Sequence, residues 1–96
     1  MTDKGSAVSR RVTIVNQRGL HARASAKFVN TVSALGGDVA VNVEKDGQTV
    51  PGNSIMGLMM LGAAKGSEVT IHVAGADASR VADKLEGLFL DGFGED

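Results

Sequence analysis

Hydrophobic and polar residues alternate in four short stretches of the chain, a pattern typical of strands with one buried face. The clearest stretches are residues 39–43 and 69–73, where valine or isoleucine occupies every second position. A similar alternation predicts a strand over about residues 9–16. Asp46-Gly47 predicts a hairpin turn that leads into a short strand over residues 48–50.

Apolar residues at helical spacing mark three further segments. Gly36-Gly37 is a typical closing signal for the first of them. Ser54 and Asp77 stand where the N-cap residues of the second and third are expected. The predicted helices cover about residues 22–35, residues 55–61 and the residues that follow Asp77.

The predicted element order is therefore β-α-β-β-α-β-α. Because each strand has one apolar face, we expect an α/β two-layer sandwich of the α+β kind. In it, three helices cover one face of a four-stranded, mostly antiparallel sheet. We expect one domain over residues 1–96, with a core over about residues 8–92 and a loose N-terminal tail at residues 1–7.

Composition removes several function classes. The 96 residues include no cysteine, which excludes a disulfide framework and thiolate metal sites and fits a reducing, cytoplasmic location. Only three aromatic residues and a net charge of −1 argue against nucleic acid as a partner. No apolar run approaches a membrane span and the first residues are polar, so we expect neither a membrane partner nor a signal peptide.

Charge is distributed unevenly along the chain. Residues 1–27 carry six basic side chains and one acidic one, whereas residues 77–96 carry six acidic and two basic ones. If the fold keeps these segments on different surfaces, the basic surface would attract acidic partners or anions.

The segment Gly19-Leu20-His21-Ala22-Arg23 joins a predicted strand to a predicted helix. Free N–H groups and the helix dipole favour an anion at such a helix start. A neutral imidazole there has a lone pair that could accept a phosphoryl group. On position alone, a histidine that only caps the helix is the simpler interpretation. His21 and His72, with scattered carboxylates, show no recognisable metal-ligand spacing, so no metal is expected.

Two motifs together change that balance. Gly19-Leu20-His21-Ala22-Arg23 resembles the active-site signature of the HPr family of phosphocarrier proteins. Asn53-Ser54-Ile55-Met56-Gly57-Leu58-Met59 resembles the second signature of that family, around its regulatory serine. The resemblance covers about residues 8–92, and the element order matches as well.

The resemblance implies a phosphoprotein of the phosphotransferase system, which serves sugar transport or a nitrogen-related regulatory branch. His21 would accept a phosphoryl group on Nδ1 from Enzyme I, which takes it from phosphoenolpyruvate, and pass it to a histidine of an EIIA-type protein. Arg23 would stabilise the phosphate. Such a carrier is a phosphotransfer intermediate rather than an enzyme, needs no cofactor, and is expected to be a monomer.

Ser54 has two interpretations. It is a good N-cap for the helix over residues 55–61. By resemblance it is also a candidate phosphoserine, modified by HPr kinase/phosphorylase where that enzyme exists. The resemblance further implies a predicted docking surface for partners around His21, consisting of Leu20, Ala22, Ile55, Met56 and Met59. Of the apolar residues in this helix, Met56 and Met59 are expected to be exposed and Leu58 buried.

One position departs from the family pattern. Ala24 stands where family members usually carry proline, which would stiffen the first helical turn. Three interpretations stay open at this point: a phosphoryl carrier, a regulatory binding module controlled by phosphorylation of His21 and of Ser54, and an anion-binding domain in which His21 only caps a helix.

Overall fold

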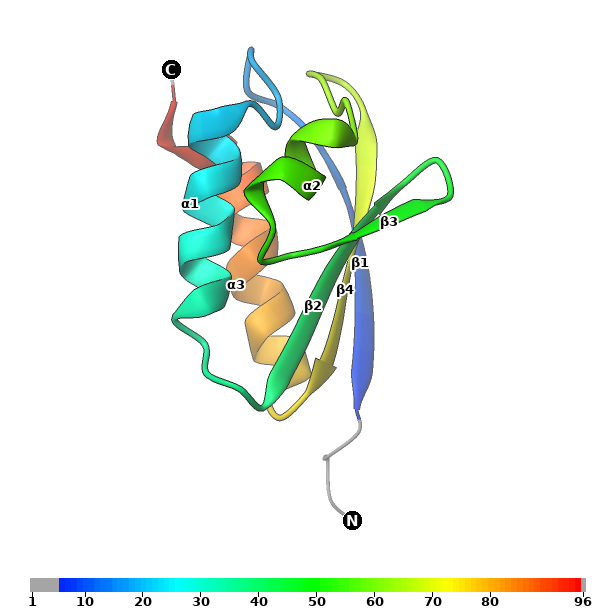
Figure 1. Ribbon diagram of the computed structural model, residues 1–96, viewed down its shortest axis with the longest axis vertical. Coiled ribbons are helices and arrows are strands. Elements are labelled where there is room, and N and C mark those ends of the chain that lie inside the picture. The colour runs from blue at the N-terminus through cyan, green and yellow to red at the C-terminus, as the bar shows by residue number, and fades with distance from the viewer. Residues whose placement is uncertain (1–5, 96) are drawn as a thin grey trace.

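A four-stranded antiparallel sheet with three helices on one face makes up the computed structural model, which describes residues 6–95 (Figure 1). The predicted fold class is confirmed. The elements, in chain order, are β1 (Ala7–Thr13), α1 (Ala22–Ser33), β2 (Val39–Lys45), β3 (Gln48–Pro51), α2 (Ile55–Met60), β4 (Glu68–Gly75), α3 (Ala78–Leu90) and the 3-10 turn η1 (Gly92–Gly94).

The strands lie in the order β1-β4-β2-β3, so β4 lies between the first two strands of the chain. All three pairings are antiparallel, and Val12 faces Val69 across β1 and β4. Because side chains alternate between the two faces of a strand, the valines and isoleucines of β2 and β4 point together toward the helices. The other face of the sheet carries polar side chains such as Thr70 and His72.

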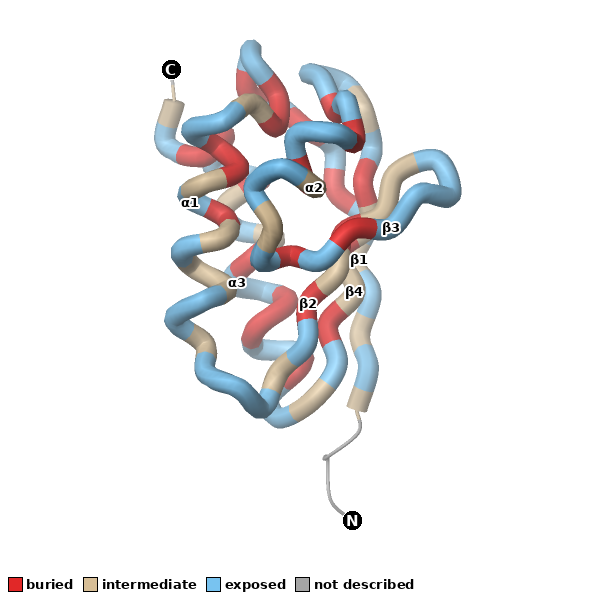
Figure 2. Tube along the Cα trace, in the orientation of Figure 1, coloured by how far each residue is buried: buried red, intermediate tan, exposed pale blue. Residues whose placement is uncertain are grey.

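The core lies between the sheet and the helices, where Figure 2 shows the buried positions gathered. Phe28 of α1 and Phe89 of α3 pack edge to face there, with ring centroids 5.7 Å apart. Phe93, from η1, packs against Phe89 in the same way at 4.9 Å. Aromatic pairs prefer this geometry, so the three phenylalanines join both long helices to the end of the described chain.

Several element boundaries differ from the predictions. β1 begins at Ala7, which belongs to the sheet rather than to a tail, and ends at Thr13; most of the predicted tail, residues 1–5, lies outside the described residues. α1 ends at Ser33: the Ala34 N–H is shared between the carbonyls of Asn30 and Thr31, and the Leu35 N–H bonds to the Val32 carbonyl, three residues back. Asp77 holds the N-cap position of α3, as expected, but its backbone is left-handed (φ 55°) and its side chain makes no capping hydrogen bond. The turn η1 was not predicted.

The basic and acidic ends of the chain do not occupy separate surfaces. Arg10 Nη1 on β1 lies 2.6 Å from Asp83 Oδ1 and 3.1 Å from Glu86 Oε1, both on α3. Glu95 lies beside His21. The two charged segments therefore neutralise one another in part, and the condition for a separate basic surface is not met.

Candidate functional site

His21 is the N-cap residue of α1, at the upper end of the helix in Figure 1. Its backbone is extended (φ −78°, ψ −175°), and its carbonyl accepts the first hydrogen bond of the helix, from the Ser25 N–H at 2.9 Å. Its ring Nδ1 faces the backbone N–H of Arg23 at 3.4 Å, a long contact. His21 thus caps the helix as the simplest interpretation predicts, and it does so through the nitrogen that a phosphoryl group would use.

The turn before His21 requires glycine at position 19. Gly19 has a φ of +60°, and a Cβ atom there would lie 2.2 Å from the carbonyl oxygen of Ala63. The same carbonyl accepts a hydrogen bond from the Leu20 N–H at 3.0 Å. The Gly19 turn therefore packs directly on the chain segment between α2 and β4, which fixes the position of His21 relative to the sheet.

Two residues of the site, Glu95 and Asn16, lie outside the two sequence motifs. Glu95 Oε2 lies 2.6 Å from His21 Nε2, and Glu95 Oε1 accepts a hydrogen bond from Asn16 Nδ2 at 3.1 Å. The hydrogen bonds from His21 and then from Asn16 lower the pKa of the Glu95 carboxyl, and the charge of Arg23 lowers it further. Glu95 is therefore a carboxylate at neutral pH. The sequence separation of 74 residues hides this contact from any local pattern.

Arg23 and Ala22 are both exposed in the first turn of α1, whereas Ala24 is fully buried. The first N–H groups of a helix have no partner within the helix. The N–H of Ala24 belongs to this set, whereas a proline at this position would have none. The first turn thus offers backbone donors near Nδ1 and the exposed side chain of Arg23, which suits a negatively charged group.

Ser54 is the N-cap of α2, as predicted. Its Oγ accepts a hydrogen bond from the Gly57 N–H at 2.9 Å. The helix that it caps packs beside α1, as Figure 1 shows. The structural interpretation of Ser54 is confirmed, and its modification stays a prediction.

The predicted docking surface needs one correction and one addition. Leu20 is only 4% exposed and lies in the same buried cluster as Leu61 and Ala63, so it is removed from the surface. Ile55, Met56 and Met59 are exposed, Met56 by 69%, and Leu58 is buried as expected. Met60, which was not predicted, is 70% exposed. Since residues four apart lie on one side of a helix, Met60 extends the surface formed by Met56.

His72, the second histidine, lies on the helix-free face of the sheet. Its Nδ1 is 2.8 Å from Ser9 Oγ and its Nε2 is 2.8 Å from Glu44 Oε1, so three strands meet at this side chain. Within residues 6–95, no group of three or more His, Asp or Glu residues is placed to hold a metal ion. No helix in that part of the chain is long and apolar enough to cross a membrane.

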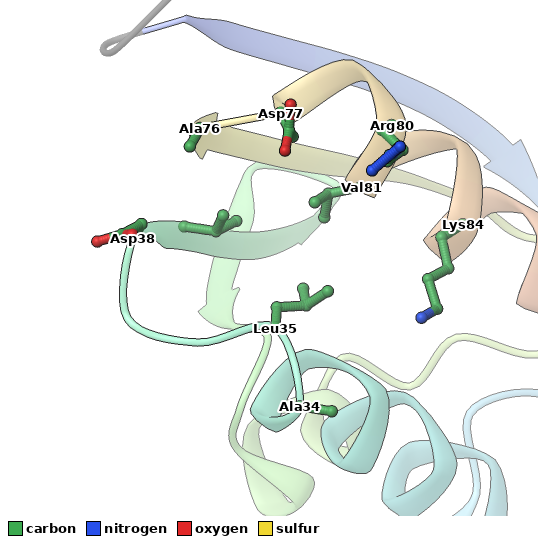
Figure 3. A pocket seen from close by; sticks show the side chains of 9 residues that line it. Ala34, Leu35, Asp38, Ala76, Asp77, Arg80, Val81 and Lys84 are labelled. Carbon is green, nitrogen blue, oxygen red and sulfur yellow. The ribbon is translucent and has the colours of Figure 1, made fainter.

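A pocket of about 380 Å³ lies at the other end of α1 from His21. Figure 3 shows it between the end of α1 and the start of α3, with Leu35 and Val81 on its apolar side and Arg80 and Lys84 above it and beside it. The twelve residues of α1 separate this pocket from His21 by about 18 Å. It is not part of the histidine site.

Residues 8–91 match the family model described as the PTS HPr component phosphorylation site. The chain belongs to the HPr family. It is similar to phosphocarrier protein HPr from Neisseria meningitidis, 45% identical over 84 residues that cover 88% of this chain and 92% of that protein. Phosphocarrier protein HPr from Pseudomonas putida is 42% identical over 87 residues, or 91% of this chain and 96% of that one.

Solved HPr structures have the same fold. The crystal structure of HPr-C-His from Thermoanaerobacter tengcongensis matches with a TM-score of 0.85 at 37% identity, covering 93% of this chain and 98% of that chain. The crystal structure of phosphocarrier protein HPr from Bacillus anthracis matches with a TM-score of 0.81 at 36% identity, covering 88% and 98%. Membership of the HPr family gives the chain its general role, that of a phosphocarrier of the phosphotransferase system.

Proposed function

We propose that His21 accepts a phosphoryl group on Nδ1 from Enzyme I and passes it to a histidine of an EIIA-type protein. The observation that carries this proposal is the place of Nδ1, at the start of α1 and in line with the Arg23 N–H. Phosphoryl transfer needs little covalent chemistry from the protein; positioning and charge stabilisation do most of the work. A nitrogen lone pair beside backbone donors and an arginine provides both.

The exposed Arg23 guanidinium supplies charge that the backbone alone lacks. A phosphoryl group on Nδ1 brings negative charge to the first turn of α1, where hydrogen bonds from charged donors are stronger than neutral ones. Because Arg23 is exposed, it is free to turn toward that group and away again. This freedom suits a carrier, which must hold the phosphoryl group and then release it.

Partners would dock on the α2 patch, which we define as Ile55, Met56, Met59 and Met60. All four side chains are exposed although they are apolar, and they belong to the helix that packs against α1, which His21 caps. An exposed apolar patch of this kind is typical of an interaction site. Methionine side chains adapt to differently shaped partners, which a protein that meets both Enzyme I and an EIIA-type protein requires. We propose that the chain does this as a monomer in the cytoplasm.

Ser54 would regulate this docking. Its Oγ is half-buried at the start of α2, directly before the α2 patch. A phosphate placed there by HPr kinase/phosphorylase would meet the N-terminal end of the helix, which favours negative charge, and would leave the fold intact. It would also place that charge beside apolar side chains, which weakens docking of a partner that binds them.

The alternative function is a regulatory binding module of the nitrogen-related branch, controlled through His21 and Ser54. Both functions require phosphorylation of His21, so binding must separate them. Pull-down with a sugar-permease EIIA and with a nitrogen-branch EIIA distinguishes a transport carrier from a regulator by which of the two is retained.

The decisive experiment is incubation with Enzyme I and phosphoenolpyruvate, followed by intact mass measurement. We expect a gain of one acid-labile phosphoryl group that is absent in His21→Ala. The chain has two histidines, so His72→Gln is the matched control and should be phosphorylated like the wild type. A wild-type chain that gains no mass would contradict the proposal and leave His21 as a helix cap only.

A further inference from the structure

We propose that Glu95 is a positioning residue of the histidine site, and that its carboxylate keeps the His21 proton on Nε2. In the neutral ring, the Nδ1 lone pair is then available to the phosphoryl group. This inference rests on the proposed function of His21, and the HPr signature motifs do not include Glu95.

The contact with Glu95 places one ring proton of His21 on Nε2. Glu95 Oε2 lies 2.6 Å from His21 Nε2, and an ionised carboxylate can only accept hydrogen bonds. Nε2 must therefore carry a hydrogen, and in a neutral imidazole the other nitrogen then has the free lone pair. The contact of Nδ1 with the Arg23 N–H, at 3.4 Å, fits the same assignment because an N–H donates to a lone pair. Both side chains are mostly shielded, with 22% of His21 and 17% of Glu95 exposed.

Asn16 holds the carboxylate in place. Its Nδ2 donates to Glu95 Oε1 at 3.1 Å and to the Gly19 carbonyl at 2.9 Å. Both acceptors face the same amide nitrogen, which fixes the orientation of the amide. Asn16 itself is buried, so it joins the Gly19 turn and Glu95 as one rigid unit.

The end of the described chain is anchored so that Glu95 reaches the site. Phe93 is buried against Phe89, and its carbonyl accepts a hydrogen bond from Lys27 Nζ at 2.8 Å. Its backbone is left-handed (φ 56°), as are those of Gly92 and Gly94 on either side. This reversal turns the chain back toward the start of α1, where Figure 1 shows the red segment beside the helix. A non-glycine residue in this conformation is costly, and here core packing of its side chain offsets the cost.

The step proceeds without any movement of a proton. The Nδ1 lone pair forms the new N–P bond as the bond between phosphorus and the donor atom of Enzyme I breaks, and that donor atom keeps the electron pair of the broken bond. The Nε2 proton stays in place, so the phosphorylated ring carries a positive charge spread over both nitrogens. Glu95 stabilises that cation in the way a carboxylate stabilises the imidazolium of a serine hydrolase. The same proton is in place when the group leaves for the acceptor, which makes the imidazole a better leaving group.

The test first determines which ring nitrogen of His21 carries the proton and then measures the rate of phosphoryl transfer. Long-range ¹H–¹⁵N spectra of the unphosphorylated protein at neutral pH report which nitrogen of His21 carries the proton. We expect Nε2–H in the wild type and a mixture of both forms in Glu95→Ala. Phosphorylation of Glu95→Ala by Enzyme I should be slower by about tenfold, the smaller end of the effect when a metal-ligating histidine loses the group that orients it.

Asp91→Asn is the matched control, because it removes a carboxylate from the same end of the chain at an exposed position. It should match the wild type in both measurements. Lys27→Met releases the Phe93 carbonyl while Glu95 remains, and it should shift the ring protons in the same direction as Glu95→Ala. Unchanged ring protonation and an unchanged rate in Glu95→Ala would overturn the inference. Failure of the wild type to be phosphorylated would contradict the proposed function instead. The spectra test the role of Glu95 separately from the proposed function, because they are recorded without Enzyme I.

Discussion

Glu95 Oε2 and His21 Nε2 lie 2.6 Å apart although 74 residues separate them in the sequence. This contact makes the stability of the protein depend on pH. The hydrogen bonds from His21 and Asn16 lower the pKa of Glu95 in the folded protein relative to the unfolded chain. A group of this kind stabilises the fold above its unfolded pKa, and that contribution is lost as the pH falls through its folded value.

The wild type should therefore exceed Glu95→Gln in free energy of unfolding at neutral pH, and the difference should shrink below about pH 5. Urea unfolding of both proteins at several pH values measures this difference in free energy. Asp91→Asn is the control, because the Asp91 side chain makes no such contact in the described part of the chain. Its difference from the wild type in free energy of unfolding should change much less with pH. A difference for Glu95→Gln that grows toward acid pH would contradict the assignment.

Gly19→Ala should destabilise the protein by about 2 kcal/mol or more, because it adds overpacking to a left-handed backbone. The new Cβ would meet the Ala63 carbonyl at 2.2 Å. Gly62→Ala is the matched control: its φ is +64° but nothing lies within 4 Å of the added atom, so only the conformational cost of about 1 kcal/mol remains. Urea unfolding of both variants checks the order. Equal losses would show that the Ala63 contact is unimportant.

Arg23→Ala should slow phosphorylation of His21 by about tenfold, since a hydrogen bond to a charged group contributes about 1.5–3 kcal/mol. The free energy of unfolding should change by no more than about 0.5 kcal/mol, because the side chain is exposed. Rates come from the mass assay at short times. Arg11→Ala, an exposed arginine on β1, should leave the rate unchanged. Equal rates for Arg23→Ala and the wild type would remove Arg23 from the site.

Met56→Asp should lower the efficiency of phosphorylation by Enzyme I by roughly tenfold, as expected for a central apolar contact of an interface. Met56 is exposed, so the fold should remain, as circular dichroism will show. Ser79→Asp adds the same charge at an exposed position in the first turn of α3, next in sequence to Arg80, which lines the pocket of Figure 3. If both variants slow the reaction alike, net charge rather than the α2 patch is responsible.

Ala24→Pro should still accept a phosphoryl group at His21. Proline fits the first turn of a helix, where its missing N–H has no helical partner in any case. The substitution removes one backbone donor near Nδ1 and leaves Arg23 and its N–H in place. The mass assay tests this directly. Complete loss of acceptance with an intact circular dichroism spectrum would assign the Ala24 N–H an essential role.

The sequence predicts local features of this protein well and long-range ones poorly. Alternation in β2 and β4 and the Ser54 cap depend on neighbours within a few residues, and all of them appear in the structure. The motif predicts Leu20 at the surface because a motif does not show which way a side chain points, and packing in the core is a long-range property. The place of Glu95 and Asn16 in the site could not be predicted from the sequence. The reversal at Phe93 brings Glu95 next to Asn16, which lies 79 residues earlier in the chain. The glycines at 92 and 94 were the available signal for that reversal.

The position of β4 between β1 and β2 has a consequence for synthesis of the protein. During translation, β1 is complete after residue 13 but pairs only with β4, which begins at residue 68. A nascent chain that ends at Gly62 already contains both signature motifs, yet lacks the strand that joins its first two strands and the carbonyl of Ala63 that supports the Gly19 turn. Such a chain has the family's motifs without a formed site. A ribosome stalled there should present Enzyme I with a poor substrate, and phosphorylation of nascent chains should begin only after β4 has emerged.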